Sequence, residues 1–184
     1  MKPRNVCLLL SLLLAGSVTN SAAQLSAVEL VQSRGLWQLR QVTDRISGKQ
    51  ATSANLTTFN VRQQSRKTGN GARLSIFCDS GKPVVFIAFT GFVSSRQTAS
   101  FAYRIDSHPG QTLTVDASSD RRSLILKDGQ HVAEFLRQIG PSSTLFVRVN
   151  SPRAGISEAE FSTAGATAAI DAALSECRAR GRAT

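Results

Sequence analysis

Short runs in which apolar residues recur at every second position constrain the fold of this chain more than any other feature. Between residues 73 and 78, Leu74, Ile76 and Cys78 share one face of an extended strand, because successive strand side chains point to opposite sides. Further short runs with strand composition occupy residues 36–42, 51–61, 83–89, 100–105, 112–116, 123–126, 144–150 and 158–162. The pattern predicts a mainly antiparallel β-sheet or sandwich, with residues 158–162 as a short edge strand.

Two later segments change to a helical period. Asp128 is a suitable N-cap for a helix at about residues 131–139, whose apolar stripe consists of Val132, Phe135, Leu136 and Ile139. A second stripe, ending at Cys177, predicts a helix at about residues 165–177. Residues 24–34 fit either a short helix or an extended lead-in. The predicted fold class is therefore α+β, with the two helices late in the chain.

The first 23 residues have the features of an export signal. Lys2 and Arg4 precede a ten-residue apolar run at 6–15, and the small residues 21–23 fit a cleavage site before Gln24. The run is too short to span a bilayer, which takes about 20 residues. We therefore expect a signal peptide at 1–23 and one periplasmic or secreted domain at 24–184, without a transmembrane segment. The alternative is a buried apolar helix of the fold.

Removal of this segment would leave two cysteines. Cys7 lies inside the apolar run, so Cys78 and Cys177 remain, and two cysteines in an oxidising compartment predict one disulfide. Such a bridge would attach the terminal helix to the sheet. Two buried free thiols are the alternative. A zinc site is disfavoured because neither cysteine has a neighbour at ligand spacing, and no metal or other cofactor is predicted.

The chain is strongly basic, with a formal net charge of +10 that falls to +8 without Lys2 and Arg4. Such a charge favours anionic partners: a cell-wall polymer, lipopolysaccharide, phospholipid headgroups or an acidic envelope protein. A merely solvated cationic surface is the alternative. Nucleic acid is not expected, because the basic residues are scattered and export separates the chain from it. The sequence leaves the oligomeric state open.

Two groups of basic residues are candidates for binding an anion or a partner. One group surrounds the polar loop at 63–71 and the other marks a later turn; a short basic tail at 178–182 ends the chain. Arginine side chains can donate paired hydrogen bonds to phosphate or carboxylate. The candidate binding residues are Arg62, Arg66, Lys67, Arg73, Arg121 and Arg122.

No catalytic pattern stands out in the sequence, so we predict a protein that is not an enzyme. A Gly-x-Ser-x-Gly elbow and a Cys-x-x-Cys pair are both absent from the sequence. Glu158 and Glu160 would share one face of a strand, and paired carboxylates can act on sugars. The alternative function is therefore a peptidoglycan-directed envelope hydrolase that uses Glu158, Glu160 or His108.

The order of several marks along the chain resembles a known family. These marks include Trp37 with Asp44 downstream, residues 74–78, the Tyr-Arg-Ile-Asp stretch at 103–106, residues 145–149, Phe161 with Gly165, and the closing helix with Cys177. Together they resemble the small exported bacterial proteins of the TagO/VasI type, which are associated with type VI secretion. The Trp-to-Asp opening is more loosely similar to exported invasion-associated locus B proteins. Both resemblances imply a non-enzymatic envelope protein, linked to secretion or to host interaction.

Overall fold

A computed structural model describes residues 30–43, 48–64 and 71–181. Its strands are β1 (Leu30–Arg34), β2 (Trp37–Thr43), β3 (Gln50–Thr58), β4 (Val61–Gln63), β5 (Ala72–Asp79), β6 (Lys82–Phe89), β7 (Thr98–Ile105), β8 (Gln111–Ala117), β9 (Ser123–Leu126), β10 (Thr144–Ser151) and β11 (Gly155–Ser162). Its helices are α1 (Gly129–Ile139), α2 (Ala166–Ala173) and α3 (Ser175–Gly181). The predicted α+β class, mainly antiparallel β with late helices, is confirmed.

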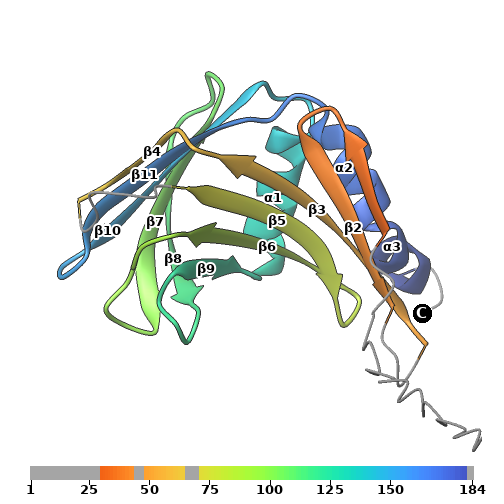
Figure 1. The fold of residues 1–184 in the computed structure, drawn as a ribbon, viewed down its shortest axis with the longest axis horizontal. Coiled ribbons are helices and arrows are strands. Elements are labelled where there is room, and N and C mark those ends of the chain that lie inside the picture. The colour runs from red at the N-terminus through yellow and green to blue at the C-terminus, as the bar shows by residue number, and fades with distance from the viewer. Residues whose placement is uncertain (1–29, 44–47, 65–70, 182–184) are drawn as a thin grey trace, which may run out of the picture.

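These strands form one antiparallel sheet in the order β1-β2-β3-β5-β6-β9-β8-β7-β10-β11-β4 within the described part of the chain. The sheet bends back on itself, because β4 follows β3 directly in sequence but pairs with β11 at the far end of this order (Figure 1). Across the corner, Thr58 Oγ1 donates a hydrogen bond to the carbonyl oxygen of Glu160 (2.7 Å), whose own amide donates to the carbonyl oxygen of Asn60 (3.0 Å).

The predicted alternation places the core inside this bend. Phe101, Tyr103 and Ile105 on β7 are buried, as are Leu74 and Ile76 on β5, while their sequence neighbours face outward or are half-buried. The Tyr103 ring stacks on Phe101 and meets the edge of Phe135 from α1, with centroids 5.7 and 5.2 Å apart. Side chains from both halves of the sheet and from the helices therefore form one hydrophobic core.

The helices cover the inner side of the sheet. The Asp128 carboxylate accepts a hydrogen bond from the His131 amide at 3.1 Å, so the predicted N-cap of α1 is confirmed. α1 packs against β6 and α2, and α2 packs against β2, β3 and β5 (Figure 1). No helix in the described ranges has both the length and the apolar character required to cross a membrane.

The predicted helical segment at about 165–177 is present, but it is interrupted once. The chain leaves helical geometry at Leu174 (φ −102°, ψ 10°), which separates α2 from α3. The apolar stripe nevertheless continues across the break, since Ala173, Leu174 and Cys177 are all buried. Two short helices can bury the same apolar stripe as one long helix. The periodicity of the sequence therefore does not locate the break.

The edge position predicted for residues 158–162 is wrong. These residues belong to β11, which lies between β10 and the three-residue strand β4. The sequence pattern does not predict β4, because three residues are too few to establish an alternation. Residues 30–34 form β1, so this part of the 24–34 segment is extended. Five stretches lie outside the described residues: the predicted signal segment 1–23, residues 24–29, residues 44–47, residues 65–70 with the candidates Arg66 and Lys67, and residues 182–184.

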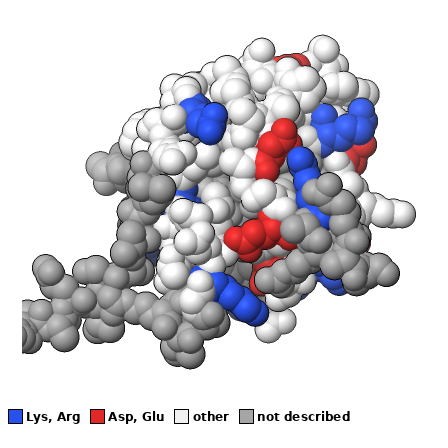
Figure 2. Space-filling view, turned by 90° about the vertical axis from the view of Figure 1, so that its right-hand side faces the viewer, with Lys and Arg blue, Asp and Glu red and all other residues white. Residues whose placement is uncertain are grey.

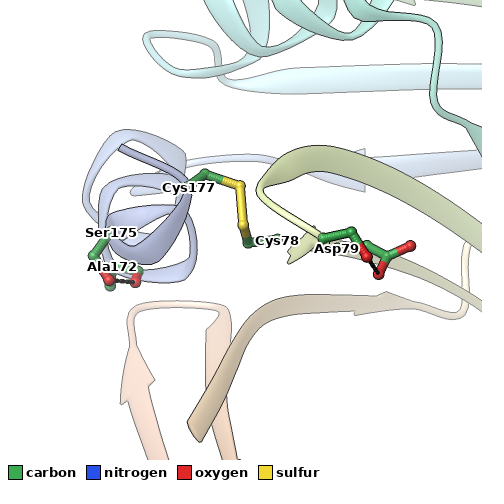
Figure 3. Close-up of a disulfide and its surroundings, with 6 residues drawn as sticks. Cys78, Asp79, Ala172, Ser175 and Cys177 are labelled. Atoms are coloured by element: carbon green, nitrogen blue, oxygen red, sulfur yellow. Dashed lines mark hydrogen bonds between the residues drawn. A yellow bond between two sulfur atoms is a disulfide. The ribbon is translucent and has the colours of Figure 1, made fainter. Parts of the chain in front are cut away.

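The predicted disulfide is confirmed. Cys78 near the end of β5 is bonded to Cys177 in α3, with their Cα atoms 5.7 Å apart (Figure 3). Cys177 is buried and Cys78 packs against the same core. The bridge therefore fixes α3 to the sheet, and such bonds persist mainly in oxidising compartments.

Candidate anion-binding surface

Several connections between strands gather at one end of the sheet, at the left and lower left of Figure 1. The antiparallel register requires this, because Ala72 pairs with Phe89, Ala88 with Ser123, and Ser100 with Asn150. We call the described connections at this end, residues 59–60, 90–97, 118–122 and 152–154, the basic end. Their charged residues are Arg96, Arg121, Arg122, Arg153 and one acid, Asp120.

Hydrogen bonds join two of these loops into one unit. The amides of Phe89 and Val93 donate to the carbonyl oxygens of Arg122 and Arg121, each at 2.9 Å. The Arg121 guanidinium donates to the carbonyl oxygen of Arg96 at 2.8 Å. Arg121 has a φ of 59°, a left-handed conformation that the turn requires. The predicted pair Arg121 and Arg122 is thereby held beside Arg96, which the sequence analysis did not single out.

The only acid of the basic end is occupied by its own loop. The Asp120 carboxylate accepts hydrogen bonds from the Ser118 hydroxyl and from the Arg122 amide. These two hydrogen bonds hold the pKa of Asp120 below its ordinary value, and the bond from the Ser118 hydroxyl has the larger effect. The Asp120 carboxylate therefore stabilises its own turn. The four arginines of the basic end outnumber this one acid, so the net charge there is positive.

Two phenylalanine rings are exposed at the same end. Phe92 is 54% exposed, and the Arg122 guanidinium lies 5.3 Å from its ring centroid. Phe59, at the corner between β3 and β4, is 82% exposed. Aromatic rings are usually buried in the core of a protein. Two exposed rings on neighbouring loops therefore indicate a contact surface.

Gly71 places the Phe59 ring close to the start of the loop that carries Phe92. A Cβ atom at Gly71 would lie 3.6 Å from the Phe59 ring and 3.7 Å from Thr90 Cγ2, so both side chains flank this glycine. The Thr90 amide also donates to the Gly71 carbonyl oxygen at 3.0 Å. Phe92 follows Thr90 by two residues, which a chain spans in about 7 Å.

A hollow of about 520 Å³ adjoins Arg96 of the basic end. It lies between the loop before β7 and the turn after β10, and Ser94, Arg96, Asn150 and Pro152 contribute to its lining. Arg153 follows Pro152 in that turn and is exposed. The hollow therefore places the loop of Arg96 next to the turn of Arg153.

The other predicted basic residues lie elsewhere or outside the described ranges. Arg62 is exposed on β4, where the register places it opposite Glu158. Arg73 is exposed on β5, opposite Thr57 and Ala88. Of the six candidates, the structure therefore brings Arg121 and Arg122 together at the basic end, places Arg62 beside an acid, and does not describe Arg66 and Lys67.

The carboxylates of the hydrolase alternative have structural partners. Glu158 Oε1 accepts a hydrogen bond from Arg148 Nε at 2.7 Å, and Glu160 Oε2 accepts one from Asn60 Nδ2 at 3.2 Å. His108 is exposed in the turn between β7 and β8, at the opposite end of β7 from the basic end. The arrangement holds the two carboxylates in interactions that link β10, β11 and the β3–β4 corner.

A second hollow, of about 410 Å³, lies on the outer face of β7, β8 and β10. Its lining includes Arg104, Phe146 and Arg148, and the Arg148 guanidinium lies 5.7 Å from the Phe146 centroid. Arg148 is already paired with Glu158 at 2.7 Å. This hollow therefore offers less uncompensated positive charge than the basic end.

The side of the molecule that carries α2 and α3 has a mixed charge. Figure 2 shows lysine and arginine interspersed with aspartate and glutamate there, and one such pair joins Arg178 to Asp171 at 2.6 Å. Within the described ranges, no three histidine, cysteine, aspartate or glutamate side chains come together as a metal site. The concentration of one charge sign therefore distinguishes the basic end from this side.

Neither the models of known protein families, nor the curated proteins, nor the solved structures contain a match to this chain.

Proposed function

We propose that this chain is an exported accessory protein of the bacterial envelope, which binds an anionic envelope component through its basic end and performs no catalysis. The observation that carries the proposal is the gathering of Arg96, Arg121, Arg122 and Arg153 around a single acid that is bonded within its own turn. A concentrated positive field attracts anionic partners and accelerates their association.

Three further features support this proposal. The Cys78–Cys177 bridge suits an oxidising compartment, and the first 23 residues have the composition of an export signal. The resemblance to the TagO/VasI type supports an accessory role associated with type VI secretion. The partner would be a phosphate-bearing or carboxylate-bearing envelope component, since these anions match the guanidinium group.

The test is capture of envelope components by the purified mature protein across a salt series. We expect capture at low salt that weakens as the ionic strength rises, because salt screens exposed charges. The triple variant Arg96→Gln, Arg122→Gln and Arg153→Gln should lose most of this capture. It retains Arg121, whose guanidinium supports the loop through the Arg96 carbonyl oxygen.

A matched control removes the same charge from other surfaces. Lys82→Gln, Arg104→Gln and Arg137→Gln change three exposed cations outside the basic end and should leave capture unchanged. Capture that ignores salt, or that falls equally in both triple variants, would contradict the role of the basic end. Digestion of purified peptidoglycan sacculi by the protein would contradict the absence of catalysis and favour the hydrolase alternative.

A further inference from the structure

We infer that the basic end docks on the surface of a phospholipid bilayer with anionic headgroups, inserting the rings of Phe59 and Phe92 among the lipids while its arginines bind lipid phosphates. This inference rests on the proposed function and names the ligand class of the same surface. Its physical basis is the combination of exposed aromatic rings and unneutralised arginines on neighbouring loops.

The aromatic side chains require an apolar partner. Phe59 and Phe92 are the two phenylalanines with large exposed surfaces in the described chain, and both lie at the basic end. Removing a phenylalanine side chain from water is favourable in proportion to its apolar area. A purely ionic polymer would leave both rings in water, whereas the headgroup and acyl boundary of a bilayer accommodates them.

The arginines identify the charge of that partner. The Arg122 guanidinium lies against the Phe92 ring, so the ring and the cation would contact the same part of the partner surface. Guanidinium groups are weakly hydrated and donate paired hydrogen bonds to phosphate. Basic residues beside an apolar contact strengthen binding to anionic lipid surfaces. An acidic protein is the competing partner, and the test separates the two.

Binding is measured by co-sedimentation of the purified mature protein with vesicles made from equal parts of phosphatidylcholine and phosphatidylglycerol, compared with phosphatidylcholine alone. We expect binding to the anionic vesicles that weakens with salt, and little binding to the neutral ones. The double variant Phe59→Ser and Phe92→Ser should bind at least about tenfold more weakly. Each ring contributes favourable free energy when it moves from water into the lipid, and the serines do not.

The control pair replaces exposed apolar side chains away from the basic end. Leu36→Ser and Val42→Ser remove residues that are 58% and 44% exposed near β2, and should leave vesicle binding unchanged. Insertion is read separately from Phe92→Trp, whose emission should shift to shorter wavelength on anionic vesicles. Trp37 is fully buried and provides a constant background, and Leu36→Trp should show no shift.

The outcomes distinguish this inference from the proposed function. Salt-dependent capture of an envelope protein or polymer without vesicle binding would overturn the inference and leave the proposed function standing. Equal losses in the phenylalanine and control pairs, or an unshifted Phe92→Trp emission, would also overturn it. A third set of phosphatidylcholine vesicles contains lipid A, and binding to these alone would overturn the inference and assign the surface to lipopolysaccharide. Failure of both vesicle binding and envelope capture would remove both proposals.

Discussion

At the residue scale, arginines that look equivalent in the sequence have different partners. Arg62 and Arg122 both occupy polar segments and were both candidates for anion binding. In the structure Arg62 lies opposite Glu158, whereas Arg122 stacks on Phe92 next to other arginines. The local sequence could identify the cations, but their neighbours come from distant strands, so the available charge at each position depends on the fold.

Asp120 offers a test of how this turn is built. Its pKa lies below the ordinary value of 3.8 in the folded protein, so the unfolded chain binds the proton more tightly. The stability that the carboxylate contributes is therefore present above about pH 4 and is lost as the pH falls through the folded-state value. We expect the difference in unfolding free energy between the wild type and Asp120→Asn to shrink over this range in urea denaturation.

A complementary variant checks the cause. Ser118→Ala removes the hydroxyl that donates to Asp120, and should raise the pKa of this carboxyl toward 3.8 when the side-chain carbon is followed by NMR titration. An Asp120 pKa at or above 3.8 in the wild type would contradict the turn geometry.

At the element scale, buried polar contacts attach the short strand β4 to its surroundings. The Gln63 amide group donates to Ser157 Oγ on β11 at 3.2 Å, and its carbonyl oxygen accepts the Gly91 amide at 3.1 Å. Gln63 and Ser157 are both buried. One glutamine therefore links β4, β11 and the loop that carries Phe92. Nothing in the local sequence around Gly91 indicates its contact with Gln63.

Gly91→Ala tests this linkage. A Cβ atom at position 91 would lie 2.9 Å from Gln63 Nε2, so the glutamine side chain must shift and lose its buried hydrogen bonds. We expect the unfolding free energy in urea to fall by about 1–3 kcal/mol. Gly129→Ala is the control, because its Cβ would meet open space, and it should change stability much less. Equal effects in the two variants would contradict the role of Gln63.

At the scale of the whole molecule, two long-range connections hold the curved sheet and its helices together. One is the β3–β4 corner, which joins β3, the third strand in the order, to β4 at the far end. The other is the Cys78–Cys177 bridge, which links residues 99 positions apart. Because the basic end is assembled from the loops that connect eight strands, its geometry depends on the fold of the whole sheet.

Removal of the bridge should therefore destabilise the whole fold. Closing a loop of this length restricts the unfolded chain, and loss of a native disulfide costs about 2–5 kcal/mol. We expect the double variant Cys78→Ala and Cys177→Ala to lose that much unfolding free energy in urea, and the reduced wild type to behave similarly. An unchanged denaturation midpoint, with reduction verified by mass spectrometry, would contradict this expectation.

Local periodicity in the chain was enough to specify several features of this protein. The alternation on β5, β7 and β10 specified which side chains are buried, the helical stripe specified the buried face of α2 and α3, and the cysteine pair specified the bridge. These follow from the geometry of a strand or helix alone. They are sufficient to predict an α+β domain, but not which strands are neighbours.

Long-range packing fixes four further features: the strand order, the break at Leu174, the interior position of β11 and the composition of the basic end. An interior strand and an edge strand can share one alternation, and two short helices can bury the same stripe as one long helix. Phe59 and Arg96 belong to this surface because antiparallel pairing brings their loops to one end of the sheet. That pairing depends on contacts between residues far apart in the sequence, which local patterns do not contain.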